Sequence, residues 1–337
     1  LIFKVCKERI SIDLHSRAEI FLRNRPSSDS GFHETTKKQN VVPLSGISER
    51  GGTGGRKTGM QAVDTPISGP IGVADISVDP PSGPFSTADE VAYRSWREAK
   101  LAAHPRDPSD LFVDIADPLA PTAAELAAIA EACTRADMCV YRFVDAPADE
   151  THARRAVSTL AAACGLTRFE KHRSAGPDGL VAIEVAKDAH RSGFIPYSTR
   201  PIGWHTDGYY AYEGPSRAIR AMVLHCVRPA AEGGVNALLD HEIAYIRLRD
   251  RDPAFVEALM RPNAMSIPPS VEEDGSVRDW AVGPVFEVDP ATGGLLMRYT
   301  ARKRHIVWAD DALTRAAVAA LEEICADDPL VFRLRLD

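Results

Sequence analysis

The strongest constraint on the fold lies in five consecutive residues, Trp204-His205-Thr206-Asp207-Gly208. In an extended segment, the side chains of residues i and i+2 leave the same face of the backbone. His205 and Asp207 can then offer an imidazole nitrogen and a carboxylate oxygen to one divalent ion. These groups are two of the three ligands of the 2-His-1-carboxylate site that is typical of non-haem iron(II). The pair therefore predicts a metal at the end of a strand, with a third ligand from a distant part of the chain.

Glycines and aromatic residues surround this pair. Gly203 and Gly208 allow the backbone to approach a ligand closely, because glycine has no Cβ atom. Three aromatic residues, Trp204, Tyr209 and Tyr210, are candidates for the walls of a substrate pocket, and ordinary core packing is the alternative interpretation.

The residues that follow predict two strands and a helix. Residues 218–227 form an apolar run that is typical of a buried strand. A turn with Gly233 and Gly234 leads into a second short strand over residues 235–239. Asp240 is then a candidate N-cap for the next helix.

The order of these features resembles the taurine/2,4-D dioxygenase (TauD/TfdA-like) family of iron(II)- and 2-oxoglutarate-dependent oxygenases. The resemblance runs from about residue 110 to residue 337, and residues 283–300 look like the family's hairpin before its last helix. It implies that His205 and Asp207 bind Fe(II), that 2-oxoglutarate is the cosubstrate, and that a small organic substrate is oxidised (hydroxylated) with release of succinate and CO2. Asn236 stands where the family usually has a Thr that helps to hold the 2-oxoglutarate carboxylate, and an amide can also donate to a carboxylate.

The third iron ligand is the open point of this interpretation. His305 is followed ten residues later by Arg315, and the family has a similar spacing between its distal His and the Arg that pairs with 2-oxoglutarate. In the family, however, that His comes after the last helix and a further strand, which here corresponds to residues 331–336. We therefore expect the third ligand and the carboxylate-binding Arg to lie beyond Asp337, with His305 and Arg315 as the minor alternative.

Two other classes of function remain open. The same pair could bind zinc for hydrolysis, although neither a clear third ligand nor an obvious general base accompanies it. The chain could also be a catalytically incomplete fragment or a binding module of this fold. The bound metal and the response to 2-oxoglutarate separate these alternatives.

The start of the chain differs in composition from the rest. Between Pro26 and Pro84 the residues are mainly Ser, Thr, Gly, Pro and charged types, which predicts a flexible segment. We therefore expect residues 1–85 to be a disordered extension. Residues 86–337 then form the dioxygenase domain, with its C-terminal end missing.

Strands and helices are mixed without regular alternation after residue 86. Periodicity and capping signals predict helices at 88–103, from Thr122, at 150–164, at 253–260 and from Asp310, and strands at 111–115, 139–143, 181–185 and 331–336. This pattern is typical of an α+β fold. The family resemblance implies more, namely a distorted double-stranded β-helix (jelly-roll) core with flanking helices.

Composition restricts the partners. Beyond residue 70 the chain has 40 acidic and 29 basic residues, which argues against nucleic acid. It contains no run of 18 apolar residues, so no membrane span is predicted. Six scattered cysteines fit a reducing cytosol. We therefore expect a cytoplasmic oxidoreductase that acts on a small molecule, and the sequence leaves a homo-oligomer open.

Overall fold

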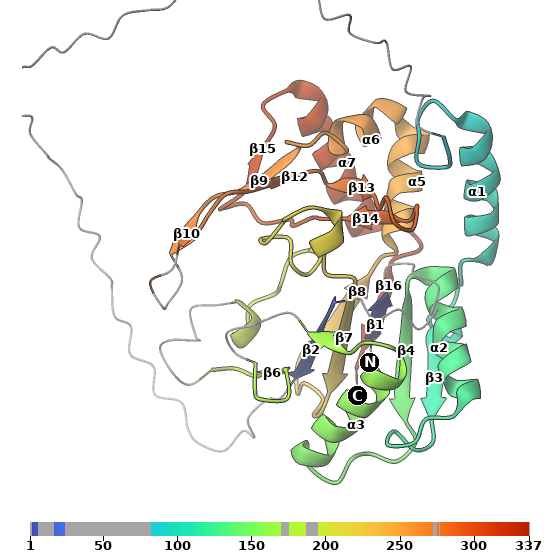
Figure 1. Ribbon diagram of the computed structural model, residues 1–337, viewed down its shortest axis with the longest axis vertical. Coiled ribbons are helices and arrows are strands. Elements are labelled where there is room, and N and C mark those ends of the chain that lie inside the picture. The colour runs from blue at the N-terminus through green and yellow to red at the C-terminus, as the bar shows by residue number, and fades with distance from the viewer. Residues whose placement is uncertain are drawn as a thin grey trace, which may run out of the picture. The chain divides into compact units, whose positions relative to one another are not determined.

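The computed structural model describes residues 2–5, 17–23, 82–169, 175–186, 195–271, 275 and 277–336. Helices and strands are mixed along these residues (Figure 1). The helices are α1 (Glu90–Ala103), α2 (Ala123–Ala136), α3 (Glu150–Ala163), α5 (His241–Arg251), α6 (Pro253–Leu259) and α7 (Ala312–Asp327). Short 3₁₀ helices cover Pro108–Leu111, Ile195–Tyr197 and Pro215–Arg217.

The largest sheet has seven strands in the order β3-β4-β1-β7-β2-β5, with β6 beside β2. Its strands are β1 (Ile2–Val5), β2 (Arg17–Arg23), β3 (Phe112–Ile115), β4 (Met138–Phe143), β5 (Arg168–Phe169), β6 (Leu180–Ile183) and β7 (Ala221–Cys226). Strand β1 is antiparallel to β4 and β7, whereas β2 is parallel to β5, β6 and β7.

The remaining strands form one small sheet and three pairs. The sheet has the order β12-β9-β15, and the pairs are β10-β11, β13-β14 and β8-β16. Their bounds are β8 (Val235–Leu238), β9 (Met265–Ile267), β10 (Ser270–Val271), β11 (Val277–Arg278), β12 (Ala281–Gly283), β13 (Phe286–Val288), β14 (Leu295–Met297), β15 (Val307–Trp308) and β16 (Phe332–Arg335). The mixed α+β prediction is confirmed. The strands within the described residues do not close into a barrel, so the jelly-roll detail stays a prediction.

Two strands of the large sheet come from the segment predicted to be a disordered extension, residues 1–85. Strands β1 and β2 both pair with β7, one on each side, and so provide hydrogen-bond partners to both edges of this central strand. The structure therefore differs from the prediction at these two segments. Most other residues of the predicted extension lie outside the described residues, and the boundary at residue 85 stays a prediction.

Side-chain caps fix where several helices begin. Thr122 accepts a hydrogen bond from the backbone N–H of Glu125 at 3.2 Å, and the Glu125 carboxylate accepts from the backbone N–H of Thr122 at 2.6 Å. This is the predicted capping box, which satisfies two N–H groups that the helix leaves free. Asp240 is the N-cap of α5, as predicted. Helix α7 begins one residue later than expected, because Asp311 rather than Asp310 accepts from the N–H of Thr314.

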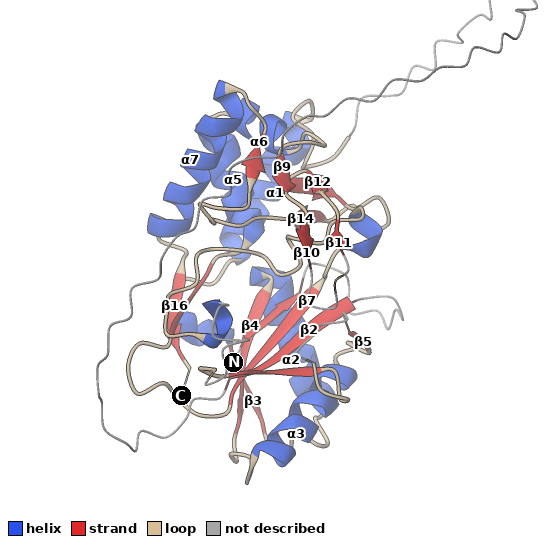
Figure 2. Ribbon diagram, turned by 90° about the vertical axis from the view of Figure 1, so that its left-hand side faces the viewer, coloured by secondary structure: helices blue, strands red, loops and turns tan. Residues whose placement is uncertain are grey.

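Two apolar clusters stabilise these elements. Helices α2 and α3 pack against the large sheet through residues such as Ile129, Leu160 and Val223 (Figure 2). A larger cluster joins α5, α6 and α7 to strands β9, β12 and β13, with Tyr245 and Phe286 fully buried within it. None of the helices in the described part of the chain has both the length and the apolar character needed to cross a membrane.

His225, on β7, is buried in the core, as its position in a predicted strand suggested. Its Nδ1 atom lies 3.3 Å from the hydroxyl of Tyr141, and its ring centroid lies 5.1 Å from that of Phe143. Burial lowers the pKa of the imidazole to about 4, from an ordinary value of 6.5. The folded protein therefore disfavours the charged form of this side chain.

We expect a pH dependence of folding from His225. Between these two pKa values the unfolded chain binds a proton that the folded protein does not, so this contribution to stability is fully present above pH 6.5 and is lost as the pH falls toward 4. Relative to His225→Phe, the native protein should lose up to about 3 kcal/mol of unfolding free energy across this window. Urea unfolding at a series of pH values measures the difference. Parallel pH profiles for the two proteins would contradict the prediction.

Candidate active site

The segment that carries the His-x-Asp pair is held extended by a strand-like contact with a distant part of the chain. His205 forms an isolated antiparallel bridge with Thr300. The N–H of Thr206 donates to the carbonyl of Tyr299 at 2.9 Å, and the N–H of Ala301 donates to the carbonyl of Trp204 at 2.7 Å. Because these bonds fix the backbone in an extended form, the side chains two residues apart project to one side.

The two predicted ligands lie close together at the surface. The Nε2 atom of His205 is 3.8 Å from Oδ1 of Asp207, and the two side chains are 35% and 22% exposed. The Nδ1 atom of His205 lies 2.8 Å from the carbonyl oxygen of Gly203, which can only accept a hydrogen bond. Nδ1 therefore donates to this carbonyl, and in the neutral imidazole Nε2, on the side of Asp207, is the nitrogen that can bind a metal.

This geometry fits one divalent metal ion. Imidazole nitrogen and carboxylate oxygen ligands bind such ions at about 2.0–2.2 Å, so two ligand atoms on one ion lie no more than about 4.4 Å apart. The observed separation of 3.8 Å is within that limit. The carbonyl that fixes the tautomer is also the kind of outer partner that metal-binding histidines usually have.

A tight turn follows the pair. Gly208 has a φ of +69°, and a Cβ atom at this position would lie 2.6 Å from Cδ1 of Ile219. Both the backbone angle and the close contact require glycine here. The turn starts the loop that returns the chain toward β7.

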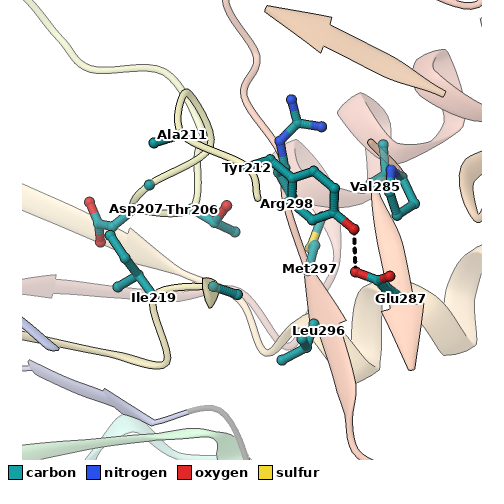
Figure 3. Close-up of a pocket in the computed structure, with 13 residues that line it drawn as sticks. Thr206, Asp207, Ala211, Tyr212, Ile219, Val285, Glu287, Leu296, Met297 and Arg298 are labelled. Atoms are coloured by element: carbon teal, nitrogen blue, oxygen red, sulfur yellow. Dashed lines mark hydrogen bonds between the residues drawn. The ribbon is translucent and has the colours of Figure 1, made fainter. Parts of the chain in front are cut away.

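A pocket lies directly beside Asp207, between this loop and the β13-β14 pair (Figure 3). In it, the hydroxyl of Tyr212 donates to the carboxylate of Glu287 at 2.6 Å. Arg298 also lines the pocket. This wall combines an acid, a phenol and a cation with apolar residues such as Ile219, a mixture that is common in small-molecule sites.

Arg298 connects the loop to two strands of the small sheet. Its guanidinium donates to the backbone carbonyls of Tyr209 at 2.8 Å, Met265 at 3.1 Å and Ala281 at 2.7 Å. Burial lowers the pKa of this group to about 10, so it remains charged at neutral pH. The buried guanidinium thus positions the residues that follow Asp207.

The aromatic residues predicted as pocket walls are not among those that line this pocket, and their role stays a prediction. Tyr209 is buried, and Trp204 and Tyr210 pack against the large apolar cluster. Tyr212 lines the pocket instead, together with Glu287. Sequence reasoning missed Tyr212, Glu287 and Arg298 as lining residues, although the last two lie in the hairpin stretch, residues 283–300, that carried part of the resemblance.

Three further residues were offered for the site by the sequence. Asn236 lies on β8, and its amide donates to the carbonyl of Gly234 at 3.2 Å. His305 is exposed and has a φ of +58°. Arg315 is exposed on α7 and forms an ion pair with Asp310 at 2.6 Å. Within the described residues, no third His, Cys, Asp or Glu places a ligand atom within 4.8 Å of the ligand atoms of both His205 and Asp207.

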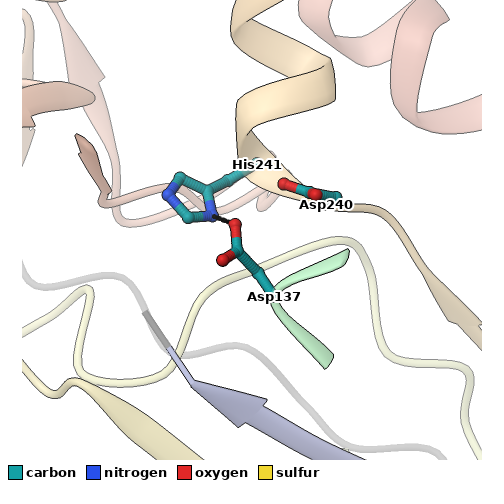
Figure 4. Close-up of side chains that lie close together, drawn as sticks. All are labelled: Asp137, Asp240 and His241. Carbon is teal, nitrogen blue, oxygen red and sulfur yellow. Dashed lines mark ion pairs between the residues drawn. The ribbon is translucent and has the colours of Figure 1, made fainter. Parts of the chain in front are cut away.

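A second group with metal-ligand chemistry is buried elsewhere. Asp137, Asp240 and His241 each place a ligand atom within 4.8 Å of the other two (Figure 4). His241 is buried, at 4% exposed. The first turn of α5 faces the protein interior, and there the His241 Nε2 atom donates to the carbonyl of Leu295 at 2.7 Å.

The ammonium of Lys100 already supplies a cation to this buried group. Its Nζ lies 2.5 Å from Asp240, 2.7 Å from Glu242 and 3.8 Å from Asp137. Burial would raise the pKa of Asp240, but the adjacent Lys100 outweighs it and holds that pKa well below its usual range. Burial and the negative charge of Asp240 raise the pKa of Asp137 instead. Oδ2 of Asp137 also lies 3.2 Å from Nδ1 of His241. These contacts favour a structural ion network over a metal site.

The fold is that of a mixed α+β protein, and the His-x-Asp pair is a candidate pair of metal ligands on it. The chain belongs to the taurine catabolism dioxygenase TauD, TfdA family, whose model matches residues 105–337. It is similar to a uridine-5'-phosphate dioxygenase from Amycolatopsis sp, with 37% identity over 100 residues, which are 29% of this chain and 33% of that protein. A uridine-5'-phosphate dioxygenase from Streptomyces sp is 37% identical over 87 residues, 25% of this chain and 28% of that protein. The matches thus span a third or less of the length of these curated relatives. The predicted family is confirmed.

Proposed function

We propose that this protein is an iron(II)- and 2-oxoglutarate-dependent dioxygenase that oxidises a small organic substrate and releases succinate and CO2. One observation carries the proposal: Nε2 of His205 lies 3.8 Å from the Asp207 carboxylate, while Nδ1 of the same ring bonds to the Gly203 carbonyl. Membership of the TauD, TfdA family supports iron and 2-oxoglutarate as the metal and the cosubstrate. The jelly-roll core that the family implies belongs to this proposal.

Each candidate site residue has a defined part in this proposal. His205 and Asp207 would hold iron, which together with 2-oxoglutarate supplies the oxidising chemistry. The bridge from His205 to Thr300 keeps both ligands on one side of the backbone. We assign Asn236 as a donor to the 2-oxoglutarate carboxylate. We place the third ligand and the carboxylate-binding arginine outside the residues that the structure describes.

The proposed substrate is a small molecule that enters beside Asp207. The pocket there offers the Glu287 carboxylate and the Tyr212 hydroxyl as hydrogen-bonding groups. The curated relatives are named for uridine-5'-phosphate. Uridine 5'-phosphate is therefore the first compound to test, with uridine as its uncharged counterpart.

An anaerobic titration with Fe(II) in the presence of 2-oxoglutarate tests the proposal. We expect the visible charge-transfer band of an iron–2-oxoglutarate chelate, because the chain provides two iron ligands and leaves positions for the cosubstrate. A band that saturates at one iron per chain supports the dioxygenase. The absence of a band, or tightly bound zinc with no response to 2-oxoglutarate, contradicts it and favours an incomplete fragment or a hydrolase.

A further inference from the structure

Three consecutive cations follow the bridge that holds the His-x-Asp segment. Arg302, Lys303 and Arg304 are all exposed. Among the described residues, no carboxylate forms an ion pair with any of the three. We name residues 302–304 the basic segment.

Two other arginines in the region pair with carboxylates. Arg217 pairs with Glu213 at 3.1 Å, and Arg220, which is largely buried, pairs with Asp289 at 2.7 Å. Because each of these two arginines has an acidic partner, the basic segment is the better candidate to attract an anionic substrate.

The basic segment is fixed next to the proposed iron ligands. Its first residue lies two positions after Thr300, which bridges His205. The guanidinium carbon of Arg302 lies 5.4 Å from the ring centroid of Tyr209, within the range of a cation–π contact. The Tyr209 ring in turn lies 6.4 Å from the imidazole ring of His205. Backbone pairing and ring contacts therefore both direct this charge to the His205 side of the molecule.

Adjacent like charges repel, and the chain has a formal net charge of −7. A local excess of positive charge on such a protein attracts and orients anions. Arginine suits a phosphate group in particular, because its planar guanidinium can donate two parallel hydrogen bonds to phosphate oxygens. We propose that the basic segment binds the phosphate of a phosphorylated small-molecule substrate and thereby sets the substrate class of the site. This inference rests on the proposed function.

Calorimetric titration of the full chain with uridine 5'-phosphate and with uridine tests the inference. We expect the phosphate to improve affinity by about 10- to 100-fold in the native protein, as charge-assisted hydrogen bonds do. In Arg302→Gln/Arg304→Gln, this preference should fall to about threefold or less, while the affinity for uridine stays unchanged. Arg94→Gln, which removes an exposed arginine on α1, is the matched control and should retain the full preference.

Several outcomes would overturn the inference. These are equal affinities for the two compounds in the native protein, failure of uridine 5'-phosphate to bind, and an undiminished preference in the double variant. A fourth is weakened binding of 2-oxoglutarate alone in the double variant, which would assign the basic segment to the cosubstrate. The iron–2-oxoglutarate band reports separately on the proposed function. If uridine 5'-phosphate binds more tightly than uridine but the iron–2-oxoglutarate band is absent, only the dioxygenase proposal is contradicted. If the band appears and the two compounds bind equally, only the inference is contradicted.

Discussion

Lys100→Met should lower the unfolding free energy by about 3–5 kcal/mol, because it removes one partner from a buried ion network. The Lys100 side chain is 3% exposed, and its Nζ lies between the carboxylates of Asp240 and Glu242. Methionine is similar in length, so the change removes the charge while it leaves little empty space. Urea unfolding at neutral pH measures the loss.

Two further variants make this test specific. Arg94→Met removes an exposed charge from the same helix, where the pair with Glu90 is 72% and 52% exposed, and should cost less than about 1 kcal/mol. Adding Asp240→Asn and Glu242→Gln to Lys100→Met should restore part of the stability, since Asp137, whose pKa burial raises, is then the one carboxyl group left of the three that surround Lys100. Asparagine also retains the N-cap of α5. A loss from Lys100→Met no larger than that from Arg94→Met would contradict the network.

His205→Ala should weaken Fe(II) binding by at least about 100-fold and abolish the 2-oxoglutarate charge-transfer band. Even the loss of an outer hydrogen-bond partner of a metal ligand typically costs 10–100-fold in affinity, and this change removes the ligand itself. The measurement is the anaerobic Fe(II) titration, accompanied by a urea unfolding curve to show that the variant is folded.

His305→Ala is the matched control for that experiment. His305 is exposed and lies outside any group of three close ligand side chains in the described residues, so its loss should leave iron affinity unchanged. Weakened iron binding in His305→Ala would restore this residue as the third ligand. Unchanged iron binding in His205→Ala would remove the basis of the proposed site.

Local signals in the sequence predicted much of the secondary structure. The capping box at Thr122 and the N-cap Asp240 are short-range hydrogen-bond patterns, so each can be recognised from a few neighbouring residues in the sequence. The strand pairing of β1 and β2 with β7 depends instead on contacts between distant segments. Composition alone therefore gave no sign that these two segments belong to the large sheet.

The candidate site likewise combines a feature that is local in sequence with contacts between distant segments. His205 and Asp207 are two residues apart, and their proximity follows from an extended backbone. The pocket beside them depends on a hydrogen bond from Tyr212 to Glu287, which come from different parts of the chain. The buried position of His241 likewise depends on Lys100 and Asp137, whose distance in sequence hides their contact with the start of α5. Long-range packing of this kind cannot be read from one sequence.

Because the bridge between His205 and Thr300 forms only in the folded chain, the affinity for iron at the proposed site should depend on the whole fold. Closing so long a loop costs chain entropy, which only the packing of the intervening elements offsets. A peptide with the five-residue motif would lack that support and would not hold its two ligands on one side. By linkage, a ligand that binds only the folded chain raises its stability as its concentration rises. Metal loading and resistance to unfolding should therefore rise and fall together in this protein.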